Sequence, residues 1–133
     1  MIDKLAYILS RDGKVLLTRS HGKTTWYIPG GKREPGETDH QALIREVREE
    51  LSVELVPETI RPYGVFRAQA HGKEPGQMVQ MTCYTADYQG ELHPASEIAE
   101  IRWLTYADRA IVSPVDCLIF DDLKAKGLFT GGK

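Results

Sequence analysis

The feature that most constrains this fold is a turn-rich segment that leads directly into a short amphipathic helix, between residues 29 and 53. Pro-Gly-Gly at 29–31 ends any preceding strand, and Glu-Pro-Gly-Glu at 34–37 is a turn in which proline restricts φ and glycine takes the left-handed position. Thr38 can cap a helix over 38–51, with Gln41 completing a capping box. One face of this helix is apolar and consists of Leu43, Ile44, Val47 and Leu51. A second layer of structure is needed to bury this face.

Short apolar strands are expected before and after this helix, over residues 5–9, 15–17, 63–70, 78–87 and 101–105. Asp12-Gly13 predicts a two-residue hairpin turn between the first two strands, because glycine tolerates a positive φ. In the fourth strand two faces alternate, with Val79, Met81 and Cys83 on one and Gln80, Thr82 and Tyr84 on the other.

A second helix is expected to begin at Ser113-Pro114, to run to Lys126 and to end at Gly127. Strands on both sides of the first helix, followed by this terminal helix, predict an α/β (α+β) fold. In that fold a mixed β-sheet is sandwiched between helices.

The chain has 133 residues, the length of one domain, which we expect to span 1–133. Its N-terminal apolar stretch is too short for a signal peptide and no segment reaches about 18 apolar residues, so we expect a cytoplasmic protein with no membrane partner. The net charge of −2 argues against a nucleic-acid polymer as partner and is compatible with a small phosphorylated ligand. Cys83 and Cys117 match no metal-ligand spacing and are expected to be reduced, partly buried thiols, with one disulfide as the alternative.

Three glutamates of the first helix, Glu46, Glu49 and Glu50, are spaced i, i+3 and i+4 and therefore share one strip. At about 100° per residue this strip lies beside the Leu43/Val47 face rather than opposite it. Carboxylates crowded at the edge of a core repel one another unless a cation lies among them, and a few oxygen ligands completed by phosphate are typical of Mg²⁺. A solvated charged surface is the alternative, and it is the commoner meaning of a glutamate-rich helix by itself.

From Gly31 the sequence reads GKREPGETDHQALIREVREELSV and resembles the Nudix box. That motif is glycine, five residues, glutamate, seven residues, then Arg-Glu-hydrophobe-x-Glu-Glu-x-Gly-hydrophobe. The matching positions are Gly31, Glu37, Arg45, Glu46, Val47, Glu49, Glu50 and Val53, and Ser52 alone departs from the pattern. Trp26 and the Pro-Gly-Gly at 29–31 agree with the flanks that are usual in this family. The turn-then-helix context supports the resemblance.

The resemblance implies a Mg²⁺-dependent hydrolase, with Mn²⁺ as a possible substitute. Glu46, Glu49 and Glu50 would be the principal metal ligands, the Gly31 region would add a backbone carbonyl, and Glu37 would lie near the metal. Arg45 would pair with Glu37 and hold it by a charge-assisted hydrogen bond. Either Glu49 or Glu46 would act as general base and take the proton of a water.

Four residues other than the fixed positions of the box are further candidates by the same resemblance. Arg19 and Lys32 match basic residues that contact phosphate in MutT-like members, and each has an exposed surface charge as its alternative. Glu97 falls where many members supply one more metal ligand, and Glu100 competes for that role. Asp116 matches a residue that binds the nucleobase, although Ser113-Pro114-Val115-Asp116 is itself a plausible capping box. Surface positions are expected for His21, His40, His71 and His93.

The reaction implied is cleavage of a pyrophosphate bond in a nucleoside diphosphate linked to a further group, above all a (d)NTP to (d)NMP and pyrophosphate. An acceptor at Asp116 would favour guanine or cytosine nucleotides. The alternatives are an ADP-ribose or nucleotide-sugar pyrophosphatase, and a catalytically silent Nudix sensor module. ADP-ribose enzymes commonly carry an N-terminal extension, whereas this sequence begins with its first strand, and silent members generally lose box glutamates. A monomer or a homodimer is expected.

Overall fold

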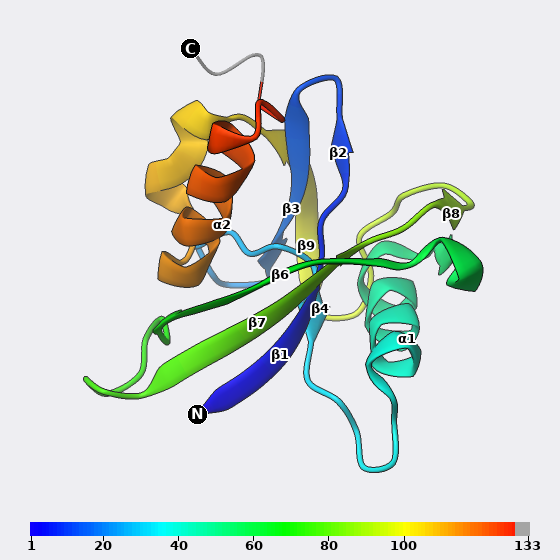
Figure 1. The fold of residues 1–133 in the computed structure, drawn as a ribbon, viewed down its shortest axis with the longest axis horizontal. Coiled ribbons are helices and arrows are strands. Elements are labelled where there is room, and N and C mark those ends of the chain that lie inside the picture. The colour runs from blue at the N-terminus through cyan, green and yellow to red at the C-terminus, as the bar shows by residue number, and fades with distance from the viewer. Residues whose placement is uncertain (130–133) are drawn as a thin grey trace.

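The computed structural model describes residues 1–129 and is built around a four-stranded mixed sheet (Figure 1). The order is β4-β1-β7-β6, with bounds Gly30–Gly31, Ile2–Tyr7, Met78–Thr85 and Arg61–Gln69. Strand β1 runs parallel to β7, whereas β4 and β6 are antiparallel to their neighbours. The predicted mixed sheet is therefore confirmed.

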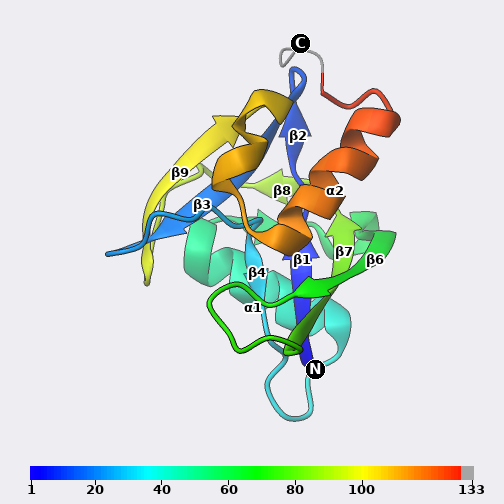
Figure 2. The same cartoon turned by 90° about the vertical axis from the view of Figure 1, so that its left-hand side faces the viewer.

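A second, antiparallel sheet has the order β2-β3-β9, with bounds Ser10–Arg11, Lys14–Ser20 and Ile98–Leu104. Figure 2, viewed from the α2 side, shows β3 and β9 paired beside the four-stranded sheet. Two short strands, β5 (Glu54–Leu55) and β8 (Tyr88–Gln89), pair separately. The helices are α1 (Asp39–Leu51) and α2 (Pro114–Ala125), with single 3₁₀ segments at Pro57–Thr59 and Tyr106–Ile111.

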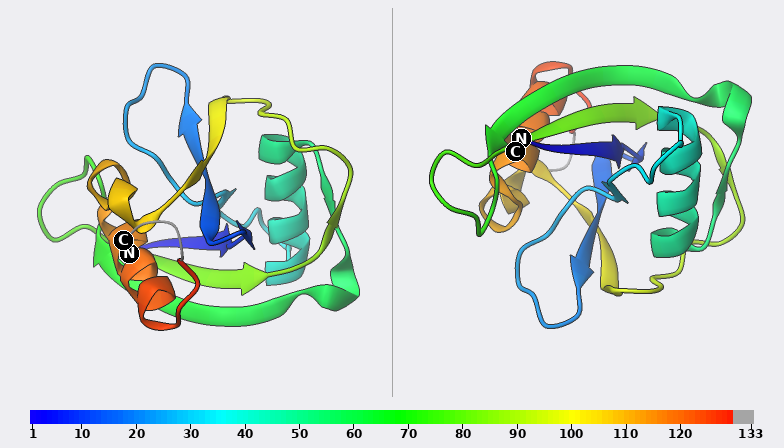
Figure 3. Two further views of the ribbon diagram at one scale, coloured as in Figure 1. Left: turned by 90° about the horizontal axis from the view of Figure 1, so that it is seen from above. Right: turned by 90° about the horizontal axis from the view of Figure 1, so that it is seen from below.

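Strand β1 contributes to both halves of the core. Leu5 and Tyr7 pack in the cluster that includes the apolar face of α1, while Ala6 and Ile8 pack in the cluster that includes α2. Alternate side chains of a strand point to opposite faces, so the four-stranded sheet buries apolar surface on both sides. Figures 1 and 3 show α1 and α2 on opposite sides of this sheet, which confirms the predicted sandwich.

The hairpin near the N-terminus differs from the prediction. Asp12 and Gly13 do form its turn, with φ of 54° and 76°. The strands that it joins, however, are β2 and β3, while β1 ends at Tyr7 and pairs with β4 and β7. The chain passes from one sheet to the other after Tyr7, and the apolar run over 5–9 does not reveal this because the strand is buried on both faces.

The remaining sequence expectations for α2 and for the cysteines and histidines agree with the structure. Ser113 caps α2, Pro114 is its first residue, and Gly127 follows its end with φ of 76°. Both cysteines are free, with Cys83 buried and Cys117 half-buried, and all four histidines are exposed. Within residues 1–129 no helix is long and apolar enough to cross a membrane.

Candidate active site

The loop between β4 and α1 leads into a well-capped helix. The Thr38 hydroxyl accepts a hydrogen bond from the Gln41 amide at 3.2 Å, and the Gln41 side chain accepts one from the Thr38 amide at 3.0 Å. This is the predicted capping box, and it sets where α1 begins.

Burial of the apolar face of α1 sets the direction of its glutamates. Leu43, Val47 and Leu51 are fully buried. Because Glu46 and Glu50 lie beside this face, their side chains are mostly enclosed, whereas Glu49 is about half exposed, at 48%. The glutamates of α1 therefore extend from the edge of the core, at Glu46 and Glu50, to solvent, at Glu49.

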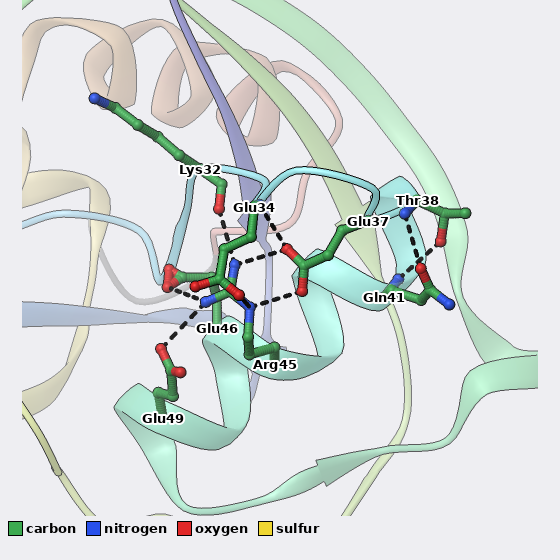
Figure 4. A network of polar contacts seen from close by, with 8 residues as sticks. All are labelled: Lys32, Glu34, Glu37, Thr38, Gln41, Arg45, Glu46 and Glu49. Carbon is green, nitrogen blue, oxygen red and sulfur yellow. Dashed lines mark hydrogen bonds and ion pairs between the residues drawn. The ribbon is translucent and has the colours of Figure 1, made fainter.

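Arg45 lies at the centre of a network of carboxylates (Figure 4). Its Nε and Nη2 donate to the two Glu37 oxygens at 2.8 and 2.9 Å, and Nη1 lies 3.3 Å from an oxygen of both Glu46 and Glu49. The hydrogen bonds from Arg45, and then one from the Glu34 amide, lower the pKa of Glu37 to about 2. The predicted Arg45–Glu37 pair is thus present, and it keeps Glu37 ionised.

Glu46 and Glu50 are carboxylates in an unfavourable environment. Glu50 is 7% exposed and accepts a hydrogen bond from the Gly30 amide at 3.2 Å. Burial, together with the nearby Glu46 and Glu97, raises the pKa of Glu50 to about 8. Burial likewise raises the pKa of Glu46, with Glu49 and Glu97 adding to the effect and Arg45 opposing it. Burial and neighbouring carboxylates thus disfavour the ionised forms of Glu46 and Glu50.

Gly31 is required by its close approach to Glu46. A Cβ atom at this position would lie 1.9 Å from Glu46 Oε2, so any other residue would displace the carboxylate. The first glycine of the motif and the first glutamate of the helix strip are therefore packed against each other.

A cavity of about 460 Å³ opens beside these groups. Six of the residues predicted from sequence line it, namely Gly31, Lys32, Arg45, Glu46, Glu50 and Glu97. In Figure 4 the Lys32 side chain extends away from the Arg45 network. Four other predicted residues, Arg19, Glu37, Glu49 and Asp116, are not part of the wall. We refer to this space as the acidic cavity.

Of the two competing carboxylates near β9, Glu97 and not Glu100 lines the acidic cavity. Glu100 lies opposite Arg19 in the β3–β9 register and contacts its guanidinium at 3.3 Å and that of Arg102 at 2.7 Å. Arg19 also donates to the backbone carbonyls of Ser20 and Lys23. Arg19 and Glu100 therefore neutralise each other outside the cavity.

The donor set of the acidic cavity suits a hard divalent cation. In the part of the chain that the structure describes, no three acidic, histidine or cysteine side chains already converge on one point, and Glu46 and Glu49 contact Arg45. Glu46, Glu50 and Glu97 nevertheless share one wall, and all of their donors are oxygen. A cation there would relieve the repulsion that raises the pKa of Glu46 and Glu50.

A family model described as the NUDIX domain matches residues 4–114, which is most of the chain. The chain belongs to the Nudix family. Two curated relatives are the CTP pyrophosphohydrolase of Escherichia coli (strain K12) and the RNA pyrophosphohydrolase of Yersinia enterocolitica. The first is 33% identical over 108 residues, which are 77% of this chain and 75% of the relative. The second is 30% identical over 117 residues, which are 74% of this chain and 66% of the relative.

Among solved structures, that of the E. coli ORF135 protein is similar, with a TM-score of 0.73 and 29% identity. The similarity covers 95% of this chain and 92% of that chain. Membership of the Nudix family, together with the pyrophosphohydrolase relatives, identifies an enzyme that hydrolyses phosphorus-containing acid anhydrides.

The one departure from the Nudix box, Ser52, ends α1 in the left-handed conformation that the motif glycine would adopt. Its φ and ψ are 64° and 22°, and its amide donates to the Arg48 carbonyl. The Ser52 hydroxyl donates to the His93 carbonyl at 3.2 Å. This hydrogen bond offsets part of the cost of a left-handed serine.

Asp116 is fully buried at the start of α2. Its Oδ2 accepts hydrogen bonds from the Ser113 hydroxyl at 2.7 Å and from the Ile28 amide at 3.2 Å, while Oδ1 has no hydrogen-bond partner among residues 1–129. Burial raises the pKa of Asp116 to about 7. The carboxylate therefore holds the segment before β4 against the start of α2.

Lys4, Tyr27 and Met81 are site residues that the sequence did not reveal. They line the acidic cavity and also a second cavity of about 220 Å³, whose wall includes Ser113 and Val115 at the start of α2. A lysine in the first strand of a buried sheet was the only available signal, since Lys4 precedes the apolar run of β1. We refer to the second space as the α2 cavity.

Proposed function

We propose that this Nudix hydrolase cleaves a (d)NTP to the (d)NMP and pyrophosphate in the presence of Mg²⁺. The observation that carries the proposal is that the acidic cavity and the α2 cavity share Lys4, Tyr27 and Met81. One nucleotide can then place its phosphates among the Nudix glutamates and its base in the more apolar space. A substrate of this shape needs two adjoining subsites of different polarity.

The proposed ligands of Mg²⁺, or of Mn²⁺ in its place, are Glu46, Glu49 and Glu50, with the Gly31 carbonyl and Glu97. When bound, the ion would supply positive charge that offsets the charge of the diphosphate and would make a nearby water more acidic. Arg45 holds Glu37 close to this group. It also faces Glu46 and Glu49, so it limits their mutual repulsion.

The general base predicted from sequence is Glu49 or Glu46. Glu46 lines the acidic cavity, so its carboxylate faces the space in which the phosphates and a water would lie. Glu49 is half exposed and faces Arg45. We therefore favour Glu46, and the pH–rate profiles of Glu46→Gln and Glu49→Gln compare the two assignments.

For the substrate, Lys32 in the cavity wall is the proposed phosphate contact, and Lys4 at the junction of the two cavities is a second. Arg19 would have to leave Glu100 to reach phosphate, so we propose that it instead holds the loop after β3. Asp116 lies behind the wall of the α2 cavity, and we propose that it positions the residues at 26–28. A direct contact of its Oδ1 with a guanine or cytosine base is the alternative predicted from sequence.

The relatives support a nucleotide substrate but differ in its identity. One is named a CTP pyrophosphohydrolase and another an RNA pyrophosphohydrolase. All four glutamates of the Nudix box are present, which favours catalysis over a silent sensor module. ADP-ribose and nucleotide sugars are the alternative substrates of the same chemistry.

A substrate panel tests the proposal directly. Phosphate release would be measured, with added pyrophosphatase or phosphatase, for nucleoside triphosphates, ADP-ribose, nucleotide sugars and 5′-triphosphorylated RNA. We expect guanine or cytosine triphosphates to be the best substrates with Mg²⁺, and activity to vanish in chelator and return with Mg²⁺ or Mn²⁺. Preferential cleavage of ADP-ribose, or activity that is indifferent to chelator, would reject the proposed reaction.

A further inference from the structure

A third hollow, of about 540 Å³, is lined by residues of two loops. One loop follows β3 and contributes Ser20, Lys23 and Thr25, and the other joins β6 to β7 and contributes His71 and Lys73. Tyr27 completes its wall. We call this hollow the lysine groove.

The two walls of the lysine groove are tied together. Thr25 Oγ1 lies 3.1 Å from His71 Nε2, and the ring of Tyr27 meets the His71 ring edge-on at 6.2 Å. On the β3 side, Arg19 Nη1 donates to the carbonyls of Ser20 and Lys23 while the same guanidinium is held by Glu100. The groove is therefore a built feature, bounded by side chains that contact one another.

The lysine groove differs in charge from the acidic cavity, whose wall combines four carboxylates with the basic side chains of Lys4, Lys32, Arg33 and Arg45. Among residues 1–129, no carboxylate lines the lysine groove or the α2 cavity, whereas Glu34, Glu46, Glu50 and Glu97 line the acidic cavity. Lys23 and Lys73 face the groove, together with hydroxyl and backbone groups of its loops. Such a surface favours an anion, although the chain as a whole has a net charge of −2.

The three spaces meet at Tyr27, which lines all of them. Ser20 is shared by the acidic cavity and the lysine groove, and Lys73 by the α2 cavity and the lysine groove. A nucleotide also branches three ways, because its ribose carries the 5′-phosphates, the base and the 3′-oxygen. With the 5′-phosphates in the acidic cavity and the base in the α2 cavity, the 3′-oxygen would face the lysine groove.

We propose that the lysine groove binds a phosphate attached to the 3′-oxygen of the substrate ribose. The inference rests on the proposed placement of the nucleotide and extends its substrate class to nucleoside 5′-polyphosphates with a 3′-phosphoryl group. That group could belong to a 3′-phosphorylated mononucleotide or to the first linkage of a 5′-triphosphorylated oligonucleotide. Lys23 and Lys73 contact the phosphate in either source.

A binding experiment that needs no catalysis tests the groove. Calorimetry in chelator would compare guanosine 3′,5′-bisphosphate with guanosine 5′-monophosphate, and the corresponding cytidine pair. We expect the 3′-phosphate to tighten Kd by roughly fivefold to tenfold at low salt, with a smaller gain at high salt. The Lys23→Gln/Lys73→Gln variant should lose this gain.

The matched control removes two exposed lysines elsewhere, as Lys14→Gln/Lys124→Gln, and so changes the net charge equally. It should keep the 3′-phosphate gain. Equal Kd values for bisphosphate and monophosphate in the wild type, or a gain that survives in Lys23→Gln/Lys73→Gln, would overturn the inference. A gain lost equally in both variants would also overturn it, because net charge would then be the cause.

Turnover distinguishes the two sources and separates this inference from the proposed reaction. The ratio of kcat/KM would be measured for triphosphates with a 3′-hydroxyl, a 3′-phosphate and a 3′-linked second nucleotide. A gain for the 3′-phosphate alone indicates a mononucleotide, and a gain for the dinucleotide indicates an oligonucleotide. If no triphosphate is cleaved but the lysine-dependent gain in Kd is present, the reaction is wrong and the groove stands. If triphosphates are cleaved and the Kd values are equal, the groove alone is wrong.

Discussion

Two buried carboxylates reach the segment at 28–31, one from each helix. Glu50 of α1 accepts a hydrogen bond from the Gly30 amide, and Asp116 of α2 accepts one from the Ile28 amide, both at 3.2 Å. Burial raises the pKa of both groups, to about 8 for Glu50 and about 7 for Asp116. In backbone contact and in burial the two residues are alike.

Their neighbours differ. Glu50 shares the wall of the acidic cavity with Glu46 and Glu97, and both of these raise its pKa further. Asp116 has the Ser113 hydroxyl beside it, and burial alone raises its pKa. A cation in the cavity would relieve the repulsion at Glu50 but would do little for Asp116. Burial of a carboxylate in this fold is thus no sign of a metal ligand by itself, because the neighbouring charges decide.

The largest effect is expected from Glu50→Gln. It removes a charged ligand while keeping its shape, and we expect kcat to fall by at least ~10²-fold, with Glu49→Gln behaving similarly. Steady-state kinetics over a range of Mg²⁺ concentrations measures the loss. The control is Glu54→Gln, an exposed carboxylate paired with Arg48, which should keep its activity. Full activity in Glu50→Gln and Glu49→Gln would contradict the metal assignment. It would also remove the proposed difference between Glu50 and Asp116.

Asp116→Ala should have an intermediate effect whose pattern defines its role. If Oδ1 contacts the base, kcat/KM should fall roughly tenfold for guanine or cytosine nucleotides and little for uridine nucleotides, because a donor would be left unpaired. If Asp116 only positions the segment at 26–28, all nucleotides should slow equally and the melting temperature should fall. Kinetics with the four triphosphates, beside thermal denaturation, separates these outcomes.

The dependence of stability on pH should distinguish the two carboxylates without any substrate. Both have folded-state pKa values above the usual value near 4, so the folded protein retains protons that the unfolded chain has released. The contribution of these two groups to the free energy of unfolding is therefore complete at low pH and is lost as pH rises from about 5 to about 8. We expect the melting temperature of the metal-free protein to fall by several degrees over this window.

Adding Mg²⁺ should restore the part of this loss that belongs to Glu50 and leave the part that belongs to Asp116. Calorimetry from pH 5 to pH 9 with Glu50→Gln and Asp116→Asn measures each part. If Mg²⁺ abolishes the dependence of the melting temperature on pH in Glu50→Gln, the proposed difference between Glu50 and Asp116 is wrong.

The smallest effect is expected from Ser52→Gly, which changes the end of α1 and leaves both carboxylates in place. Relief of the left-handed serine is worth about 0.5–1 kcal/mol, and the lost hydrogen bond to the His93 carbonyl offsets part of it. We expect the melting temperature to rise by a few degrees at most, with kcat unchanged. A large change in kcat at constant stability would show that the end of α1 influences the glutamates.

The sequence by itself determined the features that are local in the chain. The capping box of Thr38 and Gln41, the left-handed end at Ser52 and the shared strip of Glu46, Glu49 and Glu50 all follow from spacings of a few residues. These features depend on backbone geometry that the residues impose on their immediate neighbours, so they could be predicted from spacing. The pairing of Arg45 with Glu37 was instead implied by the resemblance to the Nudix box.

Only the tertiary structure decided which distant residues join the site. The choice of Glu97 over Glu100 depends on the register of β9 against β3, and Lys4 faces the cavity because β1 lies between β4 and β7. The buried hydrogen bond from the Ile28 amide to Asp116 joins residues 88 positions apart. A shift of one residue in strand register turns every side chain to the other face, and the register of β9 against β3 is set between segments that are far apart in the chain.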